Sequence, residues 1–164
     1  GRVLEIGVGT GANLPFYSRS VRLTAMDESA EMLAVATQRA SHLDHHVHWS
    51  QTDAEHLAFP EATFDTVVAS LVLCSVLDQK RTLEEFWRVL HKPKGQLLLL
   101  EHMRPRGKAL ALVADLLDMP WHGFNGRCHV NRRTEDAVAE AGFQVTRVES
   151  KLDGLLRSIV AHTV

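Results

Sequence analysis

The sequence predicts an α/β fold, a doubly wound and mostly parallel seven-stranded sheet with an antiparallel C-terminal hairpin at one edge. Three observations predict it. Short aliphatic runs alternate with segments of helical periodicity along the 164 residues, as in chains built from strand–helix–strand units. The first run leads into a glycine-rich turn at residues 7–11, where such sheets bind ligands. The last two strand-like runs are separated by a short connection, which is typical of antiparallel neighbours.

Seven segments have the composition of β-strands, being short and rich in aliphatic or β-branched residues. The expected strands are Arg2–Ile6, Arg22–Met26, His46–Ser50, Phe64–Val72, Gln96–Leu100, Gln144–Glu149 and Arg157–Val164. The fourth run is apolar over most of its length, so we expect it at the centre of the sheet, covered on both faces.

Four helices are expected between these strands. Ser29 can cap the first one through its hydroxyl group, and Gly142 suits the C-terminal end of the last. The third helix is strongly aliphatic and should stop near Pro120, because proline cannot donate a backbone hydrogen bond. The second has one apolar face, formed by Leu83, Phe86, Trp87 and Leu90. The expected ranges of the other three are residues 30–40, 108–118 and 134–141.

Length and composition indicate one globular domain covering residues 1–164. The formal net charge of -2 gives no reason to expect nucleic acid as a partner, since binders of polyanions are usually basic. Two cysteines are too few for a disulfide framework and favour a reducing compartment. We therefore expect a cytoplasmic protein. The chain begins at Gly1, directly before a strand, so we expect an upstream segment to be missing, and association with a membrane through that segment stays open.

The glycine turn and the acids around it indicate the charge of the ligand. Gly7, Gly9 and Gly11 are spaced G-x-G-x-G, whereas the dinucleotide fingerprint is G-x-G-x-x-G. Glu5 precedes the turn, where it would repel a pyrophosphate. Asp27 ends the second strand, at the position where an acid can bind ribose hydroxyls, and Asp53 follows the third. Carboxylates after three successive strands favour a cationic ligand over a phosphorylated one.

Along nearly its whole length the chain resembles the class I methyltransferases that depend on S-adenosylmethionine (SAM). SAM carries a sulfonium and an ammonium group and no phosphate, so it suits an acid-rimmed pocket. The resemblance implies SAM as cofactor and S-adenosylhomocysteine as its product. It also implies these cofactor-binding residues: Glu5, Gly7, Val8, Gly9, Thr10, Gly11, Asp27, Glu28, Met32, Asp53, Ala54, Ser70 and Leu71.

A narrower resemblance concerns the methyl acceptor. Five segments resemble the thiol S-methyltransferases of the methyltransferase-like group and their bacterial relatives: residues 71–76, Glu101-His102, Pro120-Trp121-His122, Gly126-Arg127-Cys128 and Asn131-Arg132. The resemblance to phospholipid N-methyltransferases and to the C-methyltransferases of quinone biosynthesis is looser. A small, lipophilic acceptor is implied, with a thiol favoured.

Ligands of doubly wound sheets lie beyond the carboxyl ends of the strands. The expected acceptor-binding residues there are Cys74, His102, Trp121, His122, Asn131 and Arg132. Ionising a thiol at pH 7 costs roughly 2 kcal/mol, and deprotonating an ammonium costs about 4.6 kcal/mol, so a single histidine serves a thiol more easily than an amine. We hypothesise that His102 is the base or an orienting group; a strand-end histidine bonded to local backbone is the alternative.

No metal site is expected from the sequence. His42, His45, His46 and His48 cluster without the cysteines or carboxylates that would complete a ligand set, so a solvated loop is expected there. We expect Cys74 and Cys128 to be small buried apolar residues, without a direct catalytic role. The aliphatic run at 109–117 allows two interpretations: a helix packed on the sheet or over the site, or a wall for a lipophilic acceptor that contacts a membrane surface.

Two other classes of function stay open. A nicotinamide-dependent oxidoreductase would share the glycine turn and Asp27, although the glycine spacing and Glu5 disfavour it. A SAM-binding module without catalytic activity would have the same cofactor motifs. The oligomeric state is not indicated by any motif in the chain.

Overall fold

A computed structural model describes residues 1–43, 46–124 and 128–164, without the side chains of residues 119–124. The strands are β1 (Arg2–Ile6), β2 (Arg22–Asp27), β3 (Val47–Gln51), β4 (Thr66–Ser70), β5 (Gln96–His102), β6 (Gln144–Lys151) and β7 (Leu156–His162). The helices are α1 (Ala30–Ala40), α2 (Gln79–Val89), α3 (Lys108–Phe124) and α4 (Thr134–Glu140), with short 3-10 turns η1 (Leu14–Phe16) and η2 (Leu152–Gly154).

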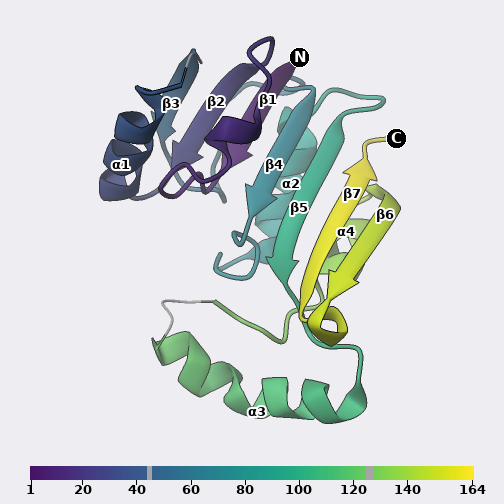
Figure 1. The fold of residues 1–164 in the computed structure, drawn as a ribbon. Helices are drawn as coiled ribbons and strands as arrows, with labels where there is room; N and C mark the ends of the chain where they lie inside the picture. The colour runs from purple at the N-terminus through teal and green to yellow at the C-terminus, as the bar shows by residue number, and fades with distance from the viewer. Residues whose placement is uncertain (44–45, 125–127) are drawn as a thin grey trace.

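The seven strands form one sheet in the order β3-β2-β1-β4-β5-β7-β6, which Figure 1 shows from its open face. Strands β1 to β5 pair in parallel. Strand β7 is antiparallel to both β5 and β6, and therefore lies between them. The predicted doubly wound sheet with an antiparallel C-terminal hairpin is confirmed, and β6 is the edge strand of that hairpin.

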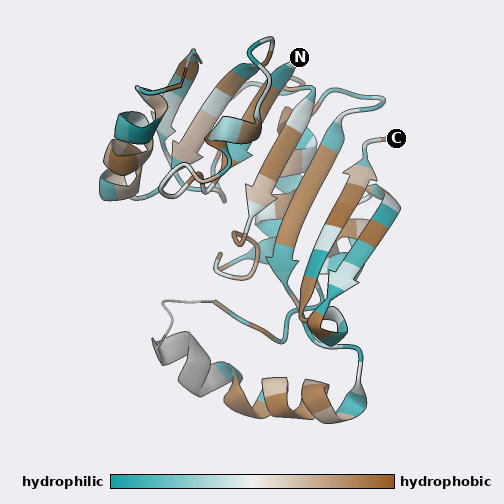
Figure 2. Cartoon of the chain, in the orientation of Figure 1, coloured by the Kyte–Doolittle hydropathy of each residue, from teal (hydrophilic) through white to brown (hydrophobic). Residues whose placement is uncertain are grey.

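Two hydrophobic clusters lie on opposite faces of the sheet, because alternate residues of each strand point to opposite sides. Leu4 and Ile6 of β1 belong to the larger cluster, with residues of α2 and α4, and both helices lie behind the sheet in Figure 1. Val3 of β1 belongs to the smaller cluster, with residues of α1. The brown central strands of Figure 2 show this apolar sheet.

The predicted Ser29 cap of α1 is confirmed, since its hydroxyl accepts a hydrogen bond from the Met32 N–H at 3.2 Å.

Strand β4 is shorter than the predicted strand at residues 64–72. Leu71 has a φ of 59°, a left-handed conformation that ends the extended backbone, and its N–H donates to the Leu100 carbonyl at 2.7 Å. At the other end, Phe64 forms only an isolated bridge with Leu90. The chain thus turns sharply at Leu71, directly at the carboxyl end of the sheet.

Helix α3 differs from the expectation that it would stop near Pro120, because its backbone stays helical as far as Phe124. Proline before the end of a helix makes a boundary probable but can be accommodated within it. The helix lies beyond the carboxyl ends of the parallel strands (Figure 1). Its buried residues include Ala111, Ala114 and Asp118, whereas its leucines and Val113 are exposed. Among the described residues, no helix combines the length and apolar character of a membrane span.

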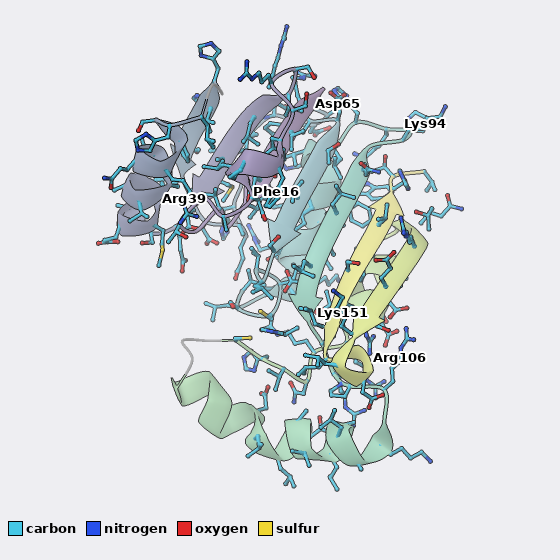
Figure 3. The ribbon with its side chains drawn as sticks, in the orientation of Figure 1. Phe16, Arg39, Asp65, Lys94, Arg106 and Lys151 are labelled. Atoms are coloured by element: carbon cyan, nitrogen blue, oxygen red, sulfur yellow. The ribbon has the colours of Figure 1, made fainter. Side chains whose placement is uncertain are left out.

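The two ends of the parallel strands differ in what surrounds them. Asp65 directly precedes β4 and Lys94 lies just before β5, and Figure 3 shows both at the end of the sheet that is far from α3. Arg106 follows β5 and lies near α3 (Figure 3). The loops at the carboxyl ends, including the glycine turn, form the side on which a ligand site is expected.

Candidate functional site

A cleft opens at the carboxyl ends of β1, β2 and β3 and is bordered by the loop that follows β4. It encloses about 220 Å³, less than the roughly 300–1,000 Å³ of pockets that bury a whole small ligand. A cofactor-sized molecule would therefore be only partly enclosed. The lining residues are Ile6, Gly7, Met26, Asp27, Glu28, Thr52, Asp53, Ala54, Glu55, Leu71, Val72, Ser75, Val76 and Leu77.

The glycine turn needs glycine for different reasons at its three positions, all of which have positive φ. A Cβ at Gly7 would lie 2.4 Å from Val72 Cγ2, and one at Gly11 would lie 2.6 Å from Leu14 Cδ1. Neighbouring side chains therefore exclude a larger residue at both positions. A Cβ at Gly9 would meet nothing within 4 Å among the described residues. The turn thus leaves open space at Gly9, where a ligand can approach the backbone.

Asp27 ends β2 and Asp53 follows β3, and both residues line the cleft. Asp27 accepts hydrogen bonds from the N–H groups of Gly9 at 2.8 Å and Ser29 at 3.0 Å. Each carboxylate oxygen has a second lone pair, so Asp27 can hold the glycine turn and still accept hydroxyl groups. Asp53 accepts from the Glu55 N–H at 2.9 Å.

Glu5 lies beneath the glycine turn, almost fully buried. Its Oε1 accepts a hydrogen bond from the side-chain amide of Asn13 at 2.9 Å, and Asn13 also donates to the Ser70 hydroxyl at 3.3 Å. Within the described part of the chain, Glu5 Oε2 is buried without a hydrogen bond of standard geometry, and the neighbouring Tyr17 hydroxyl interacts with this carboxylate. Burial raises the pKa of Glu5 above its ordinary value. A buried carboxylate oxygen without a hydrogen bond of standard geometry suits a cationic ligand group in the cleft.

The cofactor-binding residues of the sequence analysis fall into two groups. Six of them line the cleft: Gly7, Asp27, Glu28, Asp53, Ala54 and Leu71. The others do not line the cleft and lie in the glycine turn or near it: Glu5, Val8, Gly9, Thr10, Gly11, Met32 and Ser70. Met32 is 43% exposed, on the first turn of α1. Sequence reasoning missed Asn13 and Glu55, although each is a polar residue close behind a motif that it used.

The loop after β4 is held by a buried carboxylate. Glu101 Oε1 accepts the N–H groups of Val72 and Leu73, both at 2.9 Å, and its Oε2 accepts the Cys74 N–H at 3.1 Å. Burial raises the pKa of Glu101 to about 7. Burial, with the nearby Glu101 charge, also raises the pKa of the Cys74 thiol. Glu101 was singled out in the sequence only as part of a resembling pair, and here it organises the loop.

Arg132 fixes the same loop from the other side. Its guanidinium donates to the carbonyls of Leu73 at 2.5 Å and Val76 at 2.6 Å. This predicted acceptor-binding residue therefore has a structural contact with the cleft-lining segment. The Arg104 side chain lowers the pKa of the Asp115 carboxyl on α3 most, and a hydrogen bond from Asn131 lowers it further.

Two histidines lie next to the loop that Glu101 and Arg132 hold. His102 ends β5, and its Nδ1 lies 3.5 Å from Cys128 Sγ. His129 Nδ1 lies 2.8 Å from the Asp118 carboxylate, and the His129 N–H donates to the Cys74 carbonyl at 2.8 Å. His129 was not identified from the sequence, because only the return of the chain after α3 brings it to this place.

Some predicted residues cannot be placed in this way. The side chains of Trp121 and His122, together with Gly126 and Arg127, lie outside the described residues. Of the histidine cluster, His45 also lies outside them. His42 and His46 are exposed in the segment before β3, and His48 is exposed within β3. This agrees with a solvated segment at these three positions.

The family of the chain follows from comparison with known proteins. Residues 4–99, which hold the glycine turn, most of β1 and strands β2 to β4, match the model of the methyltransferase domain family. The chain belongs to this family, the class I SAM-dependent methyltransferases. Members of the class take their methyl group from SAM, which is the cosubstrate that the family implies.

Individual relatives differ in the acceptor that they methylate. The chain is 41% identical over 131 residues to the phosphatidylethanolamine N-methyltransferase of Cereibacter sphaeroides, covering 74% of the chain and 63% of that protein. It is 31% identical over 151 residues to the thiol S-methyltransferase TMT1B of Rattus norvegicus, covering 90% and 62%. It is 37% identical over 179 residues to the ubiquinone/menaquinone C-methyltransferase UbiE of Vibrio campbellii, covering 94% and 69%.

The chain thus spans 62–63% of the first two of these relatives. Among solved structures, a SAM-dependent methyltransferase of Methanosarcina mazei superposes with a TM-score of 0.79 at 23% identity, over 99% of this chain and 92% of that one. This similarity shows the Rossmann-like methyltransferase fold.

Proposed function

We propose that the protein transfers the methyl group of SAM to a small, lipophilic acceptor, and that this acceptor is a thiol. Residues 1–164 form the methyltransferase domain in this proposal. The observation that carries the choice of SAM is the carboxylate arrangement at the carboxyl ends of β1 to β3, with Glu5 beneath the turn and Asp27 and Asp53 lining the cleft. A sulfonium and an ammonium group would be stabilised there, whereas a pyrophosphate would be repelled.

The fit to SAM is supported by two features of the turn. Glu5 Oε2 is buried without a hydrogen bond of standard geometry among the described residues, although the Tyr17 hydroxyl lies close to this carboxylate, and an ammonium group would satisfy it. The open space at Gly9 allows close approach of the amino-acid part of SAM to the backbone. Asp27 would accept the ribose hydroxyls, and Asp53 with Ala54 would border the adenine.

The acceptor would bind beside the loop that follows β4. Methyl transfer is an in-line displacement, and correct positioning can supply roughly 7–11 kcal/mol without a covalent enzyme intermediate. His102 and His129 are the imidazoles next to the loop that follows β4, whereas His56 lies beside Asp53 after β3. An imidazole is a suitable base for a thiol at neutral pH. His129 would be oriented by Asp118, as a base is by its carboxylate partner.

A lipophilic acceptor is supported by α3. Its outward-facing side chains include Leu112, Leu116 and Leu117, which are 59%, 70% and 53% exposed. In Figure 2 most of the described part of α3 is coloured as hydrophobic. Such a face favours contact with a lipid surface or with an apolar acceptor, so we include peripheral membrane contact in the proposal.

Product analysis with methyl-labelled SAM tests the acceptor. The purified protein is incubated separately with a hydrophobic alkyl thiol, with phosphatidylethanolamine vesicles and with a demethylated quinol. We expect label in the thioether and little in the other products. Label in the phospholipid or the quinol alone would replace the thiol proposal by N- or C-methylation. SAM binding without any labelled product across all three would favour the inactive SAM-binding module.

A further inference from the structure

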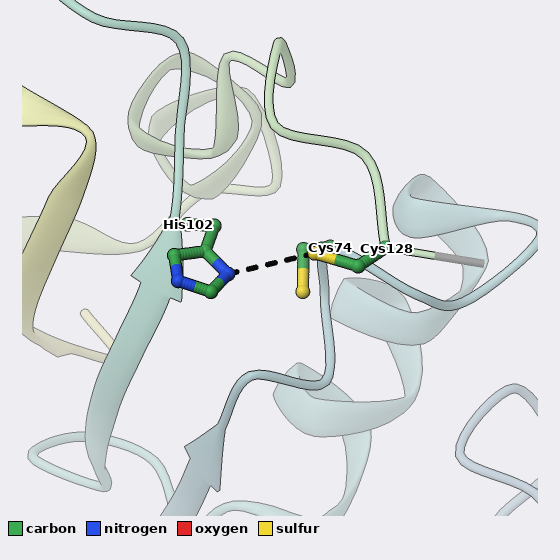
Figure 4. Close-up of side chains that lie close together, drawn as sticks. All are labelled: Cys74, His102 and Cys128. Carbon is green, nitrogen blue, oxygen red and sulfur yellow. Dashed lines mark hydrogen bonds between the residues drawn. The ribbon is translucent and has the colours of Figure 1, made fainter. Parts of the chain in front are cut away.

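Three potential metal ligands meet at the carboxyl end of the sheet. They are Cys74 from the loop after β4, His102 at the end of β5 and Cys128 from the segment after α3, and Figure 4 shows their side chains converging. The two sulfur atoms and an imidazole nitrogen all lie within 4.8 Å of one another. Cys128 Sγ lies 3.5 Å from His102 Nδ1. No motif unites these three residues as metal ligands, because they lie far apart along the chain.

The spacing of these atoms is close to that of a tetrahedral zinc site. With Zn–S near 2.3 Å and Zn–N near 2.0–2.1 Å, ligand atoms are separated by about 3.6 Å for S and N and by about 3.8 Å for two sulfurs. The contact between Cys128 and His102 already has this length. The remaining separations are at most 4.8 Å, and rotations of the cysteine side chains can shorten them to the tetrahedral values.

A thiol–imidazole hydrogen bond would account for the contact between His102 and Cys128, but it would not explain why Cys74 also points to the same place. Both cysteines are buried. The carbonyl of Cys74 accepts the His129 N–H at 2.8 Å, directly next to Cys128. This backbone contact holds the two cysteines side by side.

Neighbouring groups fix the three ligands further. The Cys74 N–H donates to Glu101 at 3.1 Å, and Glu101 precedes His102 on β5. The Asp118 carboxylate contacts the His129 ring at 2.8 Å and the Val130 N–H at 3.0 Å, which fixes the chain after Cys128. Metal sites are commonly supported by such outer hydrogen bonds.

We propose that Cys74, His102 and Cys128 bind one zinc ion through two thiolates and an imidazole. Two thiolates neutralise the charge of the ion, and binding releases both thiol protons to solvent. Three protein ligands leave the fourth position of a tetrahedral ion open, as in catalytic zinc sites. This site adjoins the cleft, because Cys74 Sγ lies 3.5 Å from the hydroxyl of Ser75, a cleft-lining residue.

The open position suits the sulfur of the acceptor, and this part of the inference rests on the proposed thiol function. The acceptor thiol would displace a water molecule from zinc and lose its proton to solvent. The zinc-held thiolate would then attack the methyl carbon of SAM. A new carbon–sulfur bond forms while the bond from that carbon to the sulfonium sulfur breaks, which gives the thioether and S-adenosylhomocysteine. No oxidant or reductant takes part.

Metal analysis tests the zinc site directly. The protein is produced with added zinc, freed of any affinity tag, and measured by mass spectrometry of its metals. We expect about one zinc per chain, close to none in Cys74→Ser, Cys128→Ser and His102→Ala, and an unchanged content in His48→Ala, which alters an exposed histidine of β3. Retained SAM binding by the variants shows that they are folded.

Trace zinc in the wild-type protein, or isolation with a Cys74–Cys128 disulfide and no metal, would overturn the site. Thiol methylation by such a zinc-free protein would nevertheless leave the proposed function intact. For the open position, cobalt replaces zinc and an alkyl thiol is added. We expect the sulfur-to-cobalt absorption band to grow with the thiol. A spectrum that the thiol leaves unchanged would overturn acceptor coordination, whereas bound zinc without thiol methylation would contradict the proposed function.

Discussion

The side-chain amide of Asn13 donates a hydrogen bond of 2.9 Å to Glu5 Oε1, directly beneath the glycine turn. This contact occupies one oxygen of a buried carboxylate, whereas Oε2 has no hydrogen bond of standard geometry among the described residues and the Tyr17 hydroxyl lies close to the carboxylate. Burying a carboxylate in this way costs free energy when no ligand is bound. Because the cost is offset when a cationic group binds, Glu5 links the stability of the fold to the charge of the ligand.

The stability of the ligand-free protein should therefore depend on pH through Glu5. Burial raises its pKa above the ordinary value of 4.5, so the folded state holds the proton more tightly than the unfolded state. The contribution of Glu5 is most favourable below pH 4.5 and is lost as pH rises through the raised folded pKa. As pH rises through this range, the free energy of unfolding of wild type, measured with urea, should fall relative to that of Glu5→Gln. A difference between the two proteins that stays constant with pH would contradict this assignment. Glu84→Gln, which changes an exposed side chain of α2, is the control.

Alanine should have different effects at the first two glycines of the turn. In Gly7→Ala the new methyl group would lie 2.4 Å from Val72, so both the melting temperature and SAM affinity should fall strongly. In Gly9→Ala only the left-handed backbone opposes the change, at about 1–2 kcal/mol, but the methyl group enters the space proposed for SAM. Thermal melting and calorimetry of both variants check this. Equal melting temperatures, or a Gly9→Ala protein with unchanged SAM affinity, would contradict it.

Arg132 should be needed for stability as well as for any contact with the acceptor. Its guanidinium donates to two carbonyls of the loop after β4, and hydrogen bonds from charged groups contribute about 1.5–3 kcal/mol each. Arg132→Met should therefore lower the free energy of unfolding by roughly 2–4 kcal/mol and weaken SAM binding, since the loop lines the cleft. An unchanged melting temperature with a raised KM for the acceptor alone would instead assign Arg132 to acceptor binding.

The exposed face of α3 should act in contact with lipid or acceptor and not in folding. Leu112→Ser and Leu116→Ser change side chains that are 59% and 70% exposed, so each should alter stability by less than about 0.5 kcal/mol. Together they should reduce co-sedimentation with phospholipid vesicles and raise the KM for a lipophilic thiol. Leu152→Ser, at an equally exposed leucine of η2, is the matched control. Equal vesicle binding by all the variants would remove the membrane contact.

The sequence was sufficient for most of the fold. Strands β1 and β5 and helix α1 begin where the pattern predicted, because short aliphatic runs and the Ser29 cap are local signals. The end of β4 was missed, since it depends on the left-handed turn at Leu71, for which leucine gives no indication. The continuation of α3 through Pro120 was missed because a proline only makes a helix end probable.

The candidate site was predicted less evenly. The glycine turn, Asp27 and Asp53 follow strands in sequence order, so parallel pairing alone brings them to one edge. The convergence of Cys74, His102 and Cys128 depends on how the chain returns after α3, and no spacing in the sequence encodes it. The same holds for the contact between His129 and Asp118. Residues held by tertiary contacts across long sequence distances were the ones that pattern reasoning could not find.

Isothermal titration calorimetry of the purified protein tests the central claim most directly, with SAM, S-adenosylhomocysteine and NAD as separate titrants. The carboxylates of Glu5, Asp27 and Asp53 predict binding of both sulfur-containing ligands near one molecule per chain, weakened by Glu5→Gln, and no measurable binding of NAD. Uptake of NAD together with no heat from SAM or S-adenosylhomocysteine would contradict the account.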